Sequence, residues 1–399
     1  MSLWLSLALA LALAGQAVAS GEVVIGGTVS RTGPNSTASV LQFTGLELWR
    51  DLVNAESGIL IGGERYTVQI VSYDDGSDPA RVPELYERLI HHDHADFLIS
   101  SYSSAMGMAS AAVAEEHDMI ILLPGSAADE IFSQGFSRVY QITKPSSRYL
   151  VPALELLARH APEVPVALVY EDDPFAVNAV EAARELARQF GLNIAFDRSY
   201  PAGATDLGGL VADLSALGPV AVVGGGHLQD GIALAEALAE AESPVPFLVL
   251  ISAPSFPEFA EIGEGALGAM YPSQWEPGVD YRPTYGPTSA EFERAFEERY
   301  GSIPSYLAAA GFNTGLVLQY ALEQAGTLDA EAVARALDET DIVTFYGNVR
   351  FDTGFERHGL QIGDGMVLVQ LQAAPDGKIV KEVVWPRAVK TAELVFPKP

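Results

Sequence analysis

The stretch DFLISSYSSAMGMASAAVAEE, residues 96–116, joins a short apolar run to a longer run of small and helix-favouring residues. A short apolar run bounded by polar residues is typical of a buried strand, and the run that follows favours a helix. Four serines, at positions 100, 101, 103 and 104, lie between the two. The stretch therefore predicts a strand that ends in hydroxyl groups where a helix begins.

The same alternation of apolar and helical runs continues through most of the chain. Further strands are predicted at residues 22–30, 66–75, 119–124, 138–142, 165–170, 192–200, 219–226 and 246–252. Strands that are apolar on both faces and separated by helices indicate a parallel sheet covered on both sides. Because the alternation restarts after residue 143, we predict an α/β fold with two doubly wound parallel-sheet lobes.

The composition limits the classes of function. Hydrophobic residues make up 49% of the 399 residues, which is enough for two sizeable cores. The formal net charge is −29, and a surface this acidic repels phosphate backbones, so we expect no nucleic-acid partner. Cysteine is absent, which excludes a thiolate zinc site, an iron–sulfur cluster and a cysteine nucleophile.

The N-terminus has the features of an export signal. The run LWLSLALALALA is too short to span a bilayer, and Ala17 and Ala19 have the small-x-small spacing that a signal peptidase requires. We therefore predict a cleaved signal peptide over residues 1–19 and a periplasmic mature protein. The alternative is a buried first helix.

Two polar turns are expected to meet at one edge of the first sheet. The turn LPGSAADEIF follows the strand at 119–124, and adjacent parallel strands would place Gly125, Ser126 and Ala127 beside Ser103 and Ser104. Hydroxyl groups and the free N–H groups of a helix N-terminus together form an acceptor for a carboxylate or another anion. In the alternative interpretation, the serines only cap the helix.

Four segments in this order carry a family resemblance: GGTVSRTGPN, the stretch ending in YTVQIVSYDDGSDP, SYSSAMGMA and LLPGSAADEIF. The chain resembles the type I periplasmic solute-binding proteins of the leucine/isoleucine/valine-binding group, which serve ABC transporters. The resemblance implies two lobes joined by three crossings and closing on a small-molecule ligand. It places residues 21–143 with 272–340 in one lobe and residues 144–271 with 341–399 in the other. It further implies delivery to an ABC permease in the inner membrane, and we expect a monomer without a cofactor.

The resemblance also indicates which residues hold the ligand. A serine of the loop Tyr102–Ser104 and the turn Gly125–Ala127 would bind its carboxylate, with Ser104 the preferred match and Ser103 the alternative. Arg31, at the cleft edge, could clamp a carboxylate or be a solvated loop residue, and Trp275 could sandwich an apolar group with Tyr102 or pack within its own segment. The predicted ligand-binding residues are Tyr102, Ser103, Ser104, Gly125, Ser126, Ala127, Phe175, His227, Arg31 and Trp275.

The chain departs from the family's pattern at Ala127, where members often have a threonine, and in the second lobe, where an acid is missing. The family's amino-acid binders place an acid after the last strand of the second lobe to hold the ligand's ammonium, whereas the stretch ISAPSF here contains none. A buried ammonium without a counter-charge is costly. Either Asp172, Asp230 or Glu276 replaces the acid, or the ligand lacks an amine, as an aromatic or aliphatic carboxylate or an amide would.

Other classes of function fit the sequence less well. A sensor subunit that reports ligand to a receptor remains open. An exported hydrolase using Ser104 or Ser126 with His227 is disfavoured, because no nucleophile elbow is present, and we predict no enzyme activity. The histidines of His91-His92-Asp93-His94 do not share one helix face, so we predict no metal site there.

Overall fold

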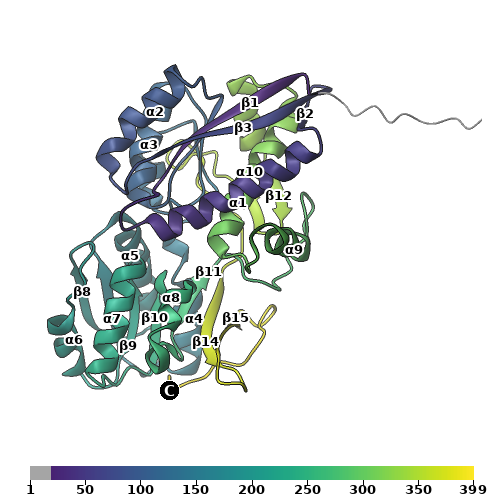
Figure 1. The fold of residues 1–399 in the computed structure, drawn as a ribbon. Helices are drawn as coiled ribbons and strands as arrows, with labels where there is room; N and C mark the ends of the chain where they lie inside the picture. The colour runs from purple at the N-terminus through teal and green to yellow at the C-terminus, as the bar shows by residue number, and fades with distance from the viewer. Residues whose placement is uncertain (1–18) are drawn as a thin grey trace, which may run out of the picture.

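The computed structural model describes residues 19–399, and it has two α/β lobes stacked one on the other (Figure 1). The predicted signal peptide lies outside the described residues except for Ala19. Within residues 19–399, none of the helices has both the length and the apolar character needed to cross a bilayer.

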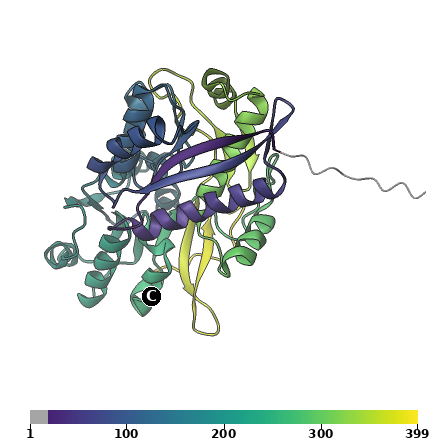
Figure 2. The same cartoon turned by 45° about the horizontal axis from the view of Figure 1, so that its top comes forward.

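The first lobe contains a sheet in the order β2-β3-β1-β4-β5-β6, parallel except for β2. Its strands are β1 (Gly21–Val29), β2 (Ile59–Ile61), β3 (Glu64–Asp74), β4 (Phe97–Ile99), β5 (Ile121–Leu123) and β6 (Val139–Gln141). Val23 and Ile25 pack on one face against α1 (Ser36–Ala55) and α10 (Tyr306–Ala325). Val24 packs on the other face against α2 (Val82–His91) and α3 (Ser104–Glu116). Figure 2 shows α1 alongside β1 and β3.

The second lobe contains a sheet in the order β15-β14-β11-β10-β9-β7-β8. Its parallel strands are β7 (Val166–Glu171), β8 (Ile194–Tyr200), β9 (Ala221–Gly225), β10 (Phe247–Leu250) and β11 (Met270–Ser273). Two antiparallel strands, β14 (Val367–Ala373) and β15 (Ile379–Trp385), complete it. The helices α4 (Val151–His160) and α5 (Pro174–Gln189) cover one face, and α6 (Gly208–Ser215) and α7 (Leu228–Glu240) cover the other. The predicted pair of doubly wound lobes is confirmed.

The predicted boundary between lobes at residue 340 is too early. The hairpin of β12 (Asp341–Thr344) and β13 (Gly347–Arg350) packs on the first lobe, where Phe345 stacks on Phe292 with ring centroids 4.5 Å apart. Leu360 also lies in the first lobe's core. The last of the three crossings therefore lies between Leu360 and β14. Four-residue strands carry no sequence signal that assigns them to one lobe.

The remaining helices are α8 (Pro257–Ala260), α9 (Ser289–Tyr300) and α11 (Ala330–Asp338). Glycines allow α10 to lie directly against α1. A Cβ on Gly45 would meet the Ala308 carbonyl oxygen at 1.8 Å, and a Cβ on Gly311 would meet the Gln42 carbonyl oxygen at 1.8 Å. This close packing fixes the start of α10, with Tyr306 and Leu307, at the edge where the two lobes meet.

Candidate functional site

The turns after β4 and β5 lie together, as the sequence predicts. The two strands pair in parallel, with Ile99 opposite Leu122. The Ser104 hydroxyl accepts hydrogen bonds from the backbone N–H of Ala127 at 3.1 Å and of Ala128 at 3.0 Å. The Ser126 hydroxyl donates to the Ser103 carbonyl oxygen at 2.9 Å. These bonds tie the two turns into one unit, here called the turn pair (residues 100–105 and 124–128).

Neither Ser103 nor Ser104 uses its side chain to cap α3. Ser103 occupies the N-cap position of α3 with φ +89°, but its side chain makes no capping bond. Ser104 bonds the neighbouring turn rather than its own helix. The interpretation in which these serines only cap the helix is therefore wrong. Ser103 has a backbone conformation that non-glycine residues rarely adopt. Such strained residues are often found at ligand-binding sites.

A second hydroxyl group lies at the same edge, and sequence analysis did not identify it. Thr143 follows β6, the strand next to β5, and its buried Oγ1 has no hydrogen-bond partner among the described residues. Orphaned buried hydroxyl groups are rare, since each costs roughly 1–3 kcal/mol. The position of Thr143 at the carboxyl end of a predicted parallel strand was the available signal. Tyr149, Tyr306 and Leu307 were missed as well.

The second lobe presents aromatic rings to the turn pair. Phe175 lies in the first turn of α5 and stacks on His227, with ring centroids 5.7 Å apart and 25° between the ring planes. Tyr149 packs nearly perpendicular to Phe175, with ring centroids 5.2 Å apart. His227 Nδ1 lies 3.3 Å from the Tyr102 hydroxyl of the first lobe. The predicted residues of the two lobes therefore face each other across one site.

The two lobes leave little space between these residues. An apolar cluster that includes Tyr102 and Tyr306 from the first lobe and Leu228 and Phe256 from the second closes one side. The remaining cavity has a volume of about 10 Å³, room for about one water molecule. Any larger ligand requires the lobes to separate or the rings to move. The lining residues are Tyr102, Ser103, Ser104, Pro124, Gly125, Ala127, Thr143, Tyr149, Phe175, His227, Tyr306 and Leu307.

Three predicted site residues lie elsewhere. Trp275 is fully buried in the first lobe's core, where its indole N–H donates to Ser289 at 2.6 Å. Arg31 is exposed and donates to the Ser72 hydroxyl at 2.7 Å, beside a separate surface groove. Ser126 belongs to the turn pair, but it is fully buried and does not line the cavity. Trp275 has the largest apolar side chain of the segment that crosses between the lobes. Burying this ring in the core removes its surface from water.

Acidic side chains lie near Nε2 of His227, the ring nitrogen that does not face Tyr102. Its Nε2 lies 3.2 Å from Asp173 Oδ2 and 3.9 Å from Glu171 Oε2. Burial lowers the pKa of His227, but the negative charges of Asp173 and its acidic neighbours outweigh burial and raise that pKa to about 9. The second lobe therefore offers an imidazolium to the site at neutral pH, with carboxylates behind it.

None of the three predicted replacement acids lines the cavity. Asp230 is buried and accepts a hydrogen bond from the Tyr200 hydroxyl at 2.5 Å, while burial, together with the charge of Glu171, raises the pKa of Asp230 to about 6. Glu276 is buried and accepts from the Tyr271 hydroxyl at 2.8 Å. Asp172 is exposed. None of these three residues therefore replaces the acid that the family's amino-acid binders use to hold the ligand's ammonium.

Comparison with known proteins agrees with this geometry. The chain is 24% identical over 411 residues to the Leu/Ile/Val-binding protein homolog 7 of Brucella melitensis, with 99% of each chain covered. It superposes on the leucine binding protein LivK of Thermotoga maritima with a TM-score of 0.76 and 19% identity, covering 92% of this chain and 99% of that one. It superposes on an R. palustris solute binding protein in complex with benzoate with a TM-score of 0.73 and 18% identity, covering 94% and 99%.

The family model described as "Periplasmic binding protein" matches residues 22–378, which is most of both lobes. The proteins of this fold and family that it resembles are solute-binding components of ABC transporters, which are not enzymes. The chain belongs to the periplasmic binding protein family, and it has the fold of the leucine binding protein described above.

Proposed function

We propose that this protein captures a small carboxylate between its lobes in the periplasm and delivers it to an ABC permease in the inner membrane. The observation that carries the proposal is that two features meet at one edge of the first lobe: a helix N-terminus that its N-cap side chain does not cap, and a buried hydroxyl that has no partner among the described residues. Ser103 lies at the start of α3 without a capping bond, and Thr143 is buried without a partner. Both line the space that the second lobe closes.

The carboxylate would bind at the N-terminus of α3. The first N–H groups of a helix have no partner within the helix, and the helix dipole favours negative charge there. Ser103 and Thr143 add two hydroxyl donors, while Ser104 keeps the neighbouring turn in place. On the opposite side, the imidazolium of His227 adds positive charge.

The rest of the ligand would be flat or apolar and without an ammonium group. Tyr102, Tyr149, Phe175 and Tyr306 line the cavity, and rings of this kind stack on planar or aliphatic groups. Among residues 19–399, no carboxylate side chain lines the cavity. Of the two structural relatives described above, one holds benzoate and the other is called a leucine binding protein. The aromatic side chains that line this cavity favour an aromatic acid such as benzoate.

An α-amino acid is the second candidate, and one observation favours it. Glu171 Oε2 is buried without a hydrogen-bond partner, 3.9 Å from His227 Nε2. If His227 moved aside as a ligand entered, Glu171 and Asp173 would offer two carboxylates to an ammonium. The two candidates require different positions of His227. An acid without an ammonium group leaves His227 in place, whereas an α-amino acid requires it to move.

Capture would proceed by separation and closure of the lobes. The contact between Tyr102 and His227 joins the two lobes across the site, and a ligand that bridges both sides would replace it. Three crossings between the lobes are compatible with a hinge.

Thermal-shift and calorimetric titrations with benzoate, 4-hydroxybenzoate, short aliphatic acids, leucine and isoleucine test the proposal. A ligand at 100 times its Kd should add about 2.7 kcal/mol to stability. The double substitution Ser103→Ala with Thr143→Val should weaken binding of the responding acid by roughly 100-fold, since each lost hydrogen bond to a charged group costs about 1.5 kcal/mol or more. Arg31→Ala is the control and should bind normally.

The outcome also separates the two candidates. Binding of leucine but not of benzoate would reject the aromatic acid and support displacement of His227. If the double variant binds as the wild type does, the turn pair is not the carboxylate site. Loss of uptake of the labelled ligand on deletion of the gene would support delivery to a permease.

A further inference from the structure

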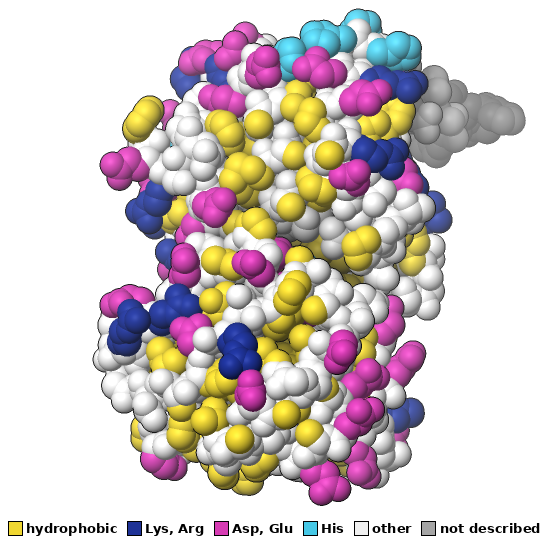
Figure 3. All heavy atoms as spheres, turned by 90° about the vertical axis from the view of Figure 1, so that its left-hand side faces the viewer, with side chains coloured by type: hydrophobic (Ala, Val, Ile, Leu, Met, Phe, Trp, Pro, Cys, Tyr) yellow, Lys and Arg dark blue, Asp and Glu magenta, His cyan; other side chains and the backbone are white. Residues whose placement is uncertain are grey.

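Histidines gather at the end of the first lobe that lies away from the cleft. His91 ends α2, His92 and His94 follow it, and His117 follows α3. In Figure 3 histidine side chains cluster at the top of the molecule. Helices between parallel strands run opposite to them, so the carboxyl ends of α2 and α3 lie at the sheet edge opposite the turn pair. The cluster is therefore separate from the ligand site.

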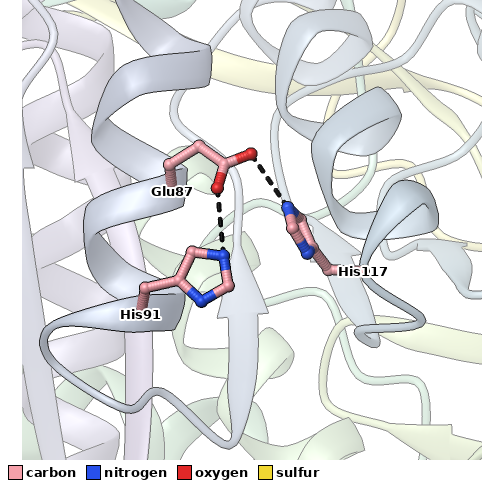
Figure 4. A group of neighbouring side chains, drawn as sticks. All are labelled: Glu87, His91 and His117. Atoms are coloured by element: carbon pink, nitrogen blue, oxygen red, sulfur yellow. Dashed lines mark hydrogen bonds and ion pairs between the residues drawn. The ribbon is translucent and has the colours of Figure 1, made fainter.

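Three side chains of this region converge on one point (Figure 4). Glu87 lies one helical turn before His91 on α2, and His117 reaches across from α3. Glu87 Oε2 lies 3.2 Å from His91 Nε2, and Glu87 Oε1 lies 2.8 Å from His117 Nε2. The ligand atoms of the three residues all lie within 4.8 Å of one another.

We infer that Glu87, His91 and His117 form a binding site for a transition-metal ion of the zinc class. A tetrahedral zinc ion holds nitrogen and oxygen ligands at about 2.0–2.2 Å, which puts the ligand atoms roughly 3.3 Å from one another. His117 lies 2.8 Å from Glu87 Oε1 and His91 lies 3.2 Å from Glu87 Oε2, and the three ligand atoms, which lie within 4.8 Å of one another, would draw closer together around an ion. Two imidazoles with one carboxylate suit zinc, copper or nickel and do not suit magnesium or calcium.

The helices α2 and α3, which position these residues, pack against each other through buried side chains. Tyr86 and Leu89 of α2 pack with Val113 and Ala114 of α3 in one buried cluster. The fourth coordination position would face solvent, because the His91 side chain is 62% exposed and the Glu87 side chain 45%. A site with three protein ligands and an open position can take water as its fourth ligand. The net charge of −29 would also attract cations to this surface.

The sequence grouped the wrong histidines. His92 Nδ1 contacts Asp93 at 2.9 Å, and neither His92 nor His94 belongs to the converging group. His117 joins it from another helix, 26 residues after His91, which no local spacing reveals. Without an ion, Glu87 shares a hydrogen bond with His117 and lies within ion-pair distance of His91, and a metal titration separates the two interpretations.

The test is a titration of the full-length mature protein, stripped of metal by a chelator, with zinc chloride against a chromogenic zinc indicator. We expect a single zinc ion per chain. Glu87→Gln and His117→Ala should each weaken zinc binding by at least about 100-fold, since loss of even an outer-shell partner costs 10- to 100-fold. His92→Ala removes an exposed histidine of the same surface and should leave the affinity within about threefold. Cobalt(II) should give a visible absorption band that disappears in His117→Ala.

Two results would overturn the inference. One is wild-type protein that fails to compete with the indicator. The other is equal loss of affinity in His92→Ala and His117→Ala, which would mean that scattered histidines bind zinc independently. Ser103→Ala should bind zinc normally, so failure of the ligand site and failure of the metal site are distinguishable. Unchanged circular dichroism of each variant confirms that loss of zinc reflects the site and not unfolding.

Discussion

The two lobes face each other across the cleft with different chemistry. The first lobe offers neutral groups, namely serine and threonine hydroxyls and backbone N–H groups, held by hydrogen bonds of 2.9–3.1 Å within the turn pair. The second lobe offers a charged ring, His227, whose state depends on buried carboxylates. The first surface is set by backbone geometry and should be insensitive to pH. The second is set by electrostatics and should respond to pH and to any change of charge.

The largest effect is expected from a substitution that breaks the geometry of the first lobe. Ser104→Ala removes the acceptor of two buried N–H groups, those of Ala127 and Ala128. Leaving each buried donor unsatisfied costs about 1–3 kcal/mol, so the unfolding free energy should fall by about 4 kcal/mol in urea titrations. Ser103→Ala is the matched control, since its hydroxyl caps nothing, and its stability should stay within about 0.5 kcal/mol of wild type. Equal stability of the two variants would contradict the proposed division of roles.

A smaller effect is expected from removing one charge in the second lobe. Asp173→Asn keeps an oxygen to cap α5, where Asp173 accepts from the Ala176 N–H at 2.8 Å, but removes the charge beside His227. The pKa of His227 should fall toward its usual value, and stability at neutral pH should fall by about 2 kcal/mol. Ring-proton NMR of the variant measures the pKa directly. An unchanged pKa would mean that Glu171 and Asp230 suffice to hold the charge.

The pH dependence of stability tests the same lobe without a mutation. Because the pKa of His227 is raised from 6.5 to about 9 on folding, its contribution is fully present below about pH 6.5 and is lost as the pH rises through 9. We expect the unfolding free energy to fall by about 2 kcal/mol between pH 7 and pH 9.5. His227→Gln should flatten this dependence, whereas Ser103→Ala should not. A slope that survives in His227→Gln would point to other titrating groups.

The sequence predicts the first lobe's site better than the second's. The serines of the turn pair follow predicted parallel strands, and strand order alone places Gly125 beside Ser103. The charge of His227 could not be predicted, because Glu171, Asp173 and Asp230 come from different elements and meet only in the folded lobe. For the same reason the lobe of the β12–β13 hairpin was assigned wrongly: its packing partners lie far from it in sequence.

The smallest effect on stability, and the most informative for the ligand, is expected from Thr143→Val. The substitution keeps the shape of the side chain and removes a buried hydroxyl that has no partner. The ligand-free protein should therefore be as stable as wild type or slightly more stable, because an apolar replacement avoids the cost of an orphaned polar group. Affinity for the responding carboxylate should fall by about tenfold, since one hydrogen bond to a charged group is worth about 1.5 kcal/mol. Calorimetric unfolding of the ligand-free protein measures the change in stability, and calorimetric titration with the carboxylate measures the change in affinity. A loss of stability without a loss of affinity would place Thr143 in the packing of the first lobe and would leave Ser103 to supply the hydroxyl of the proposed carboxylate site.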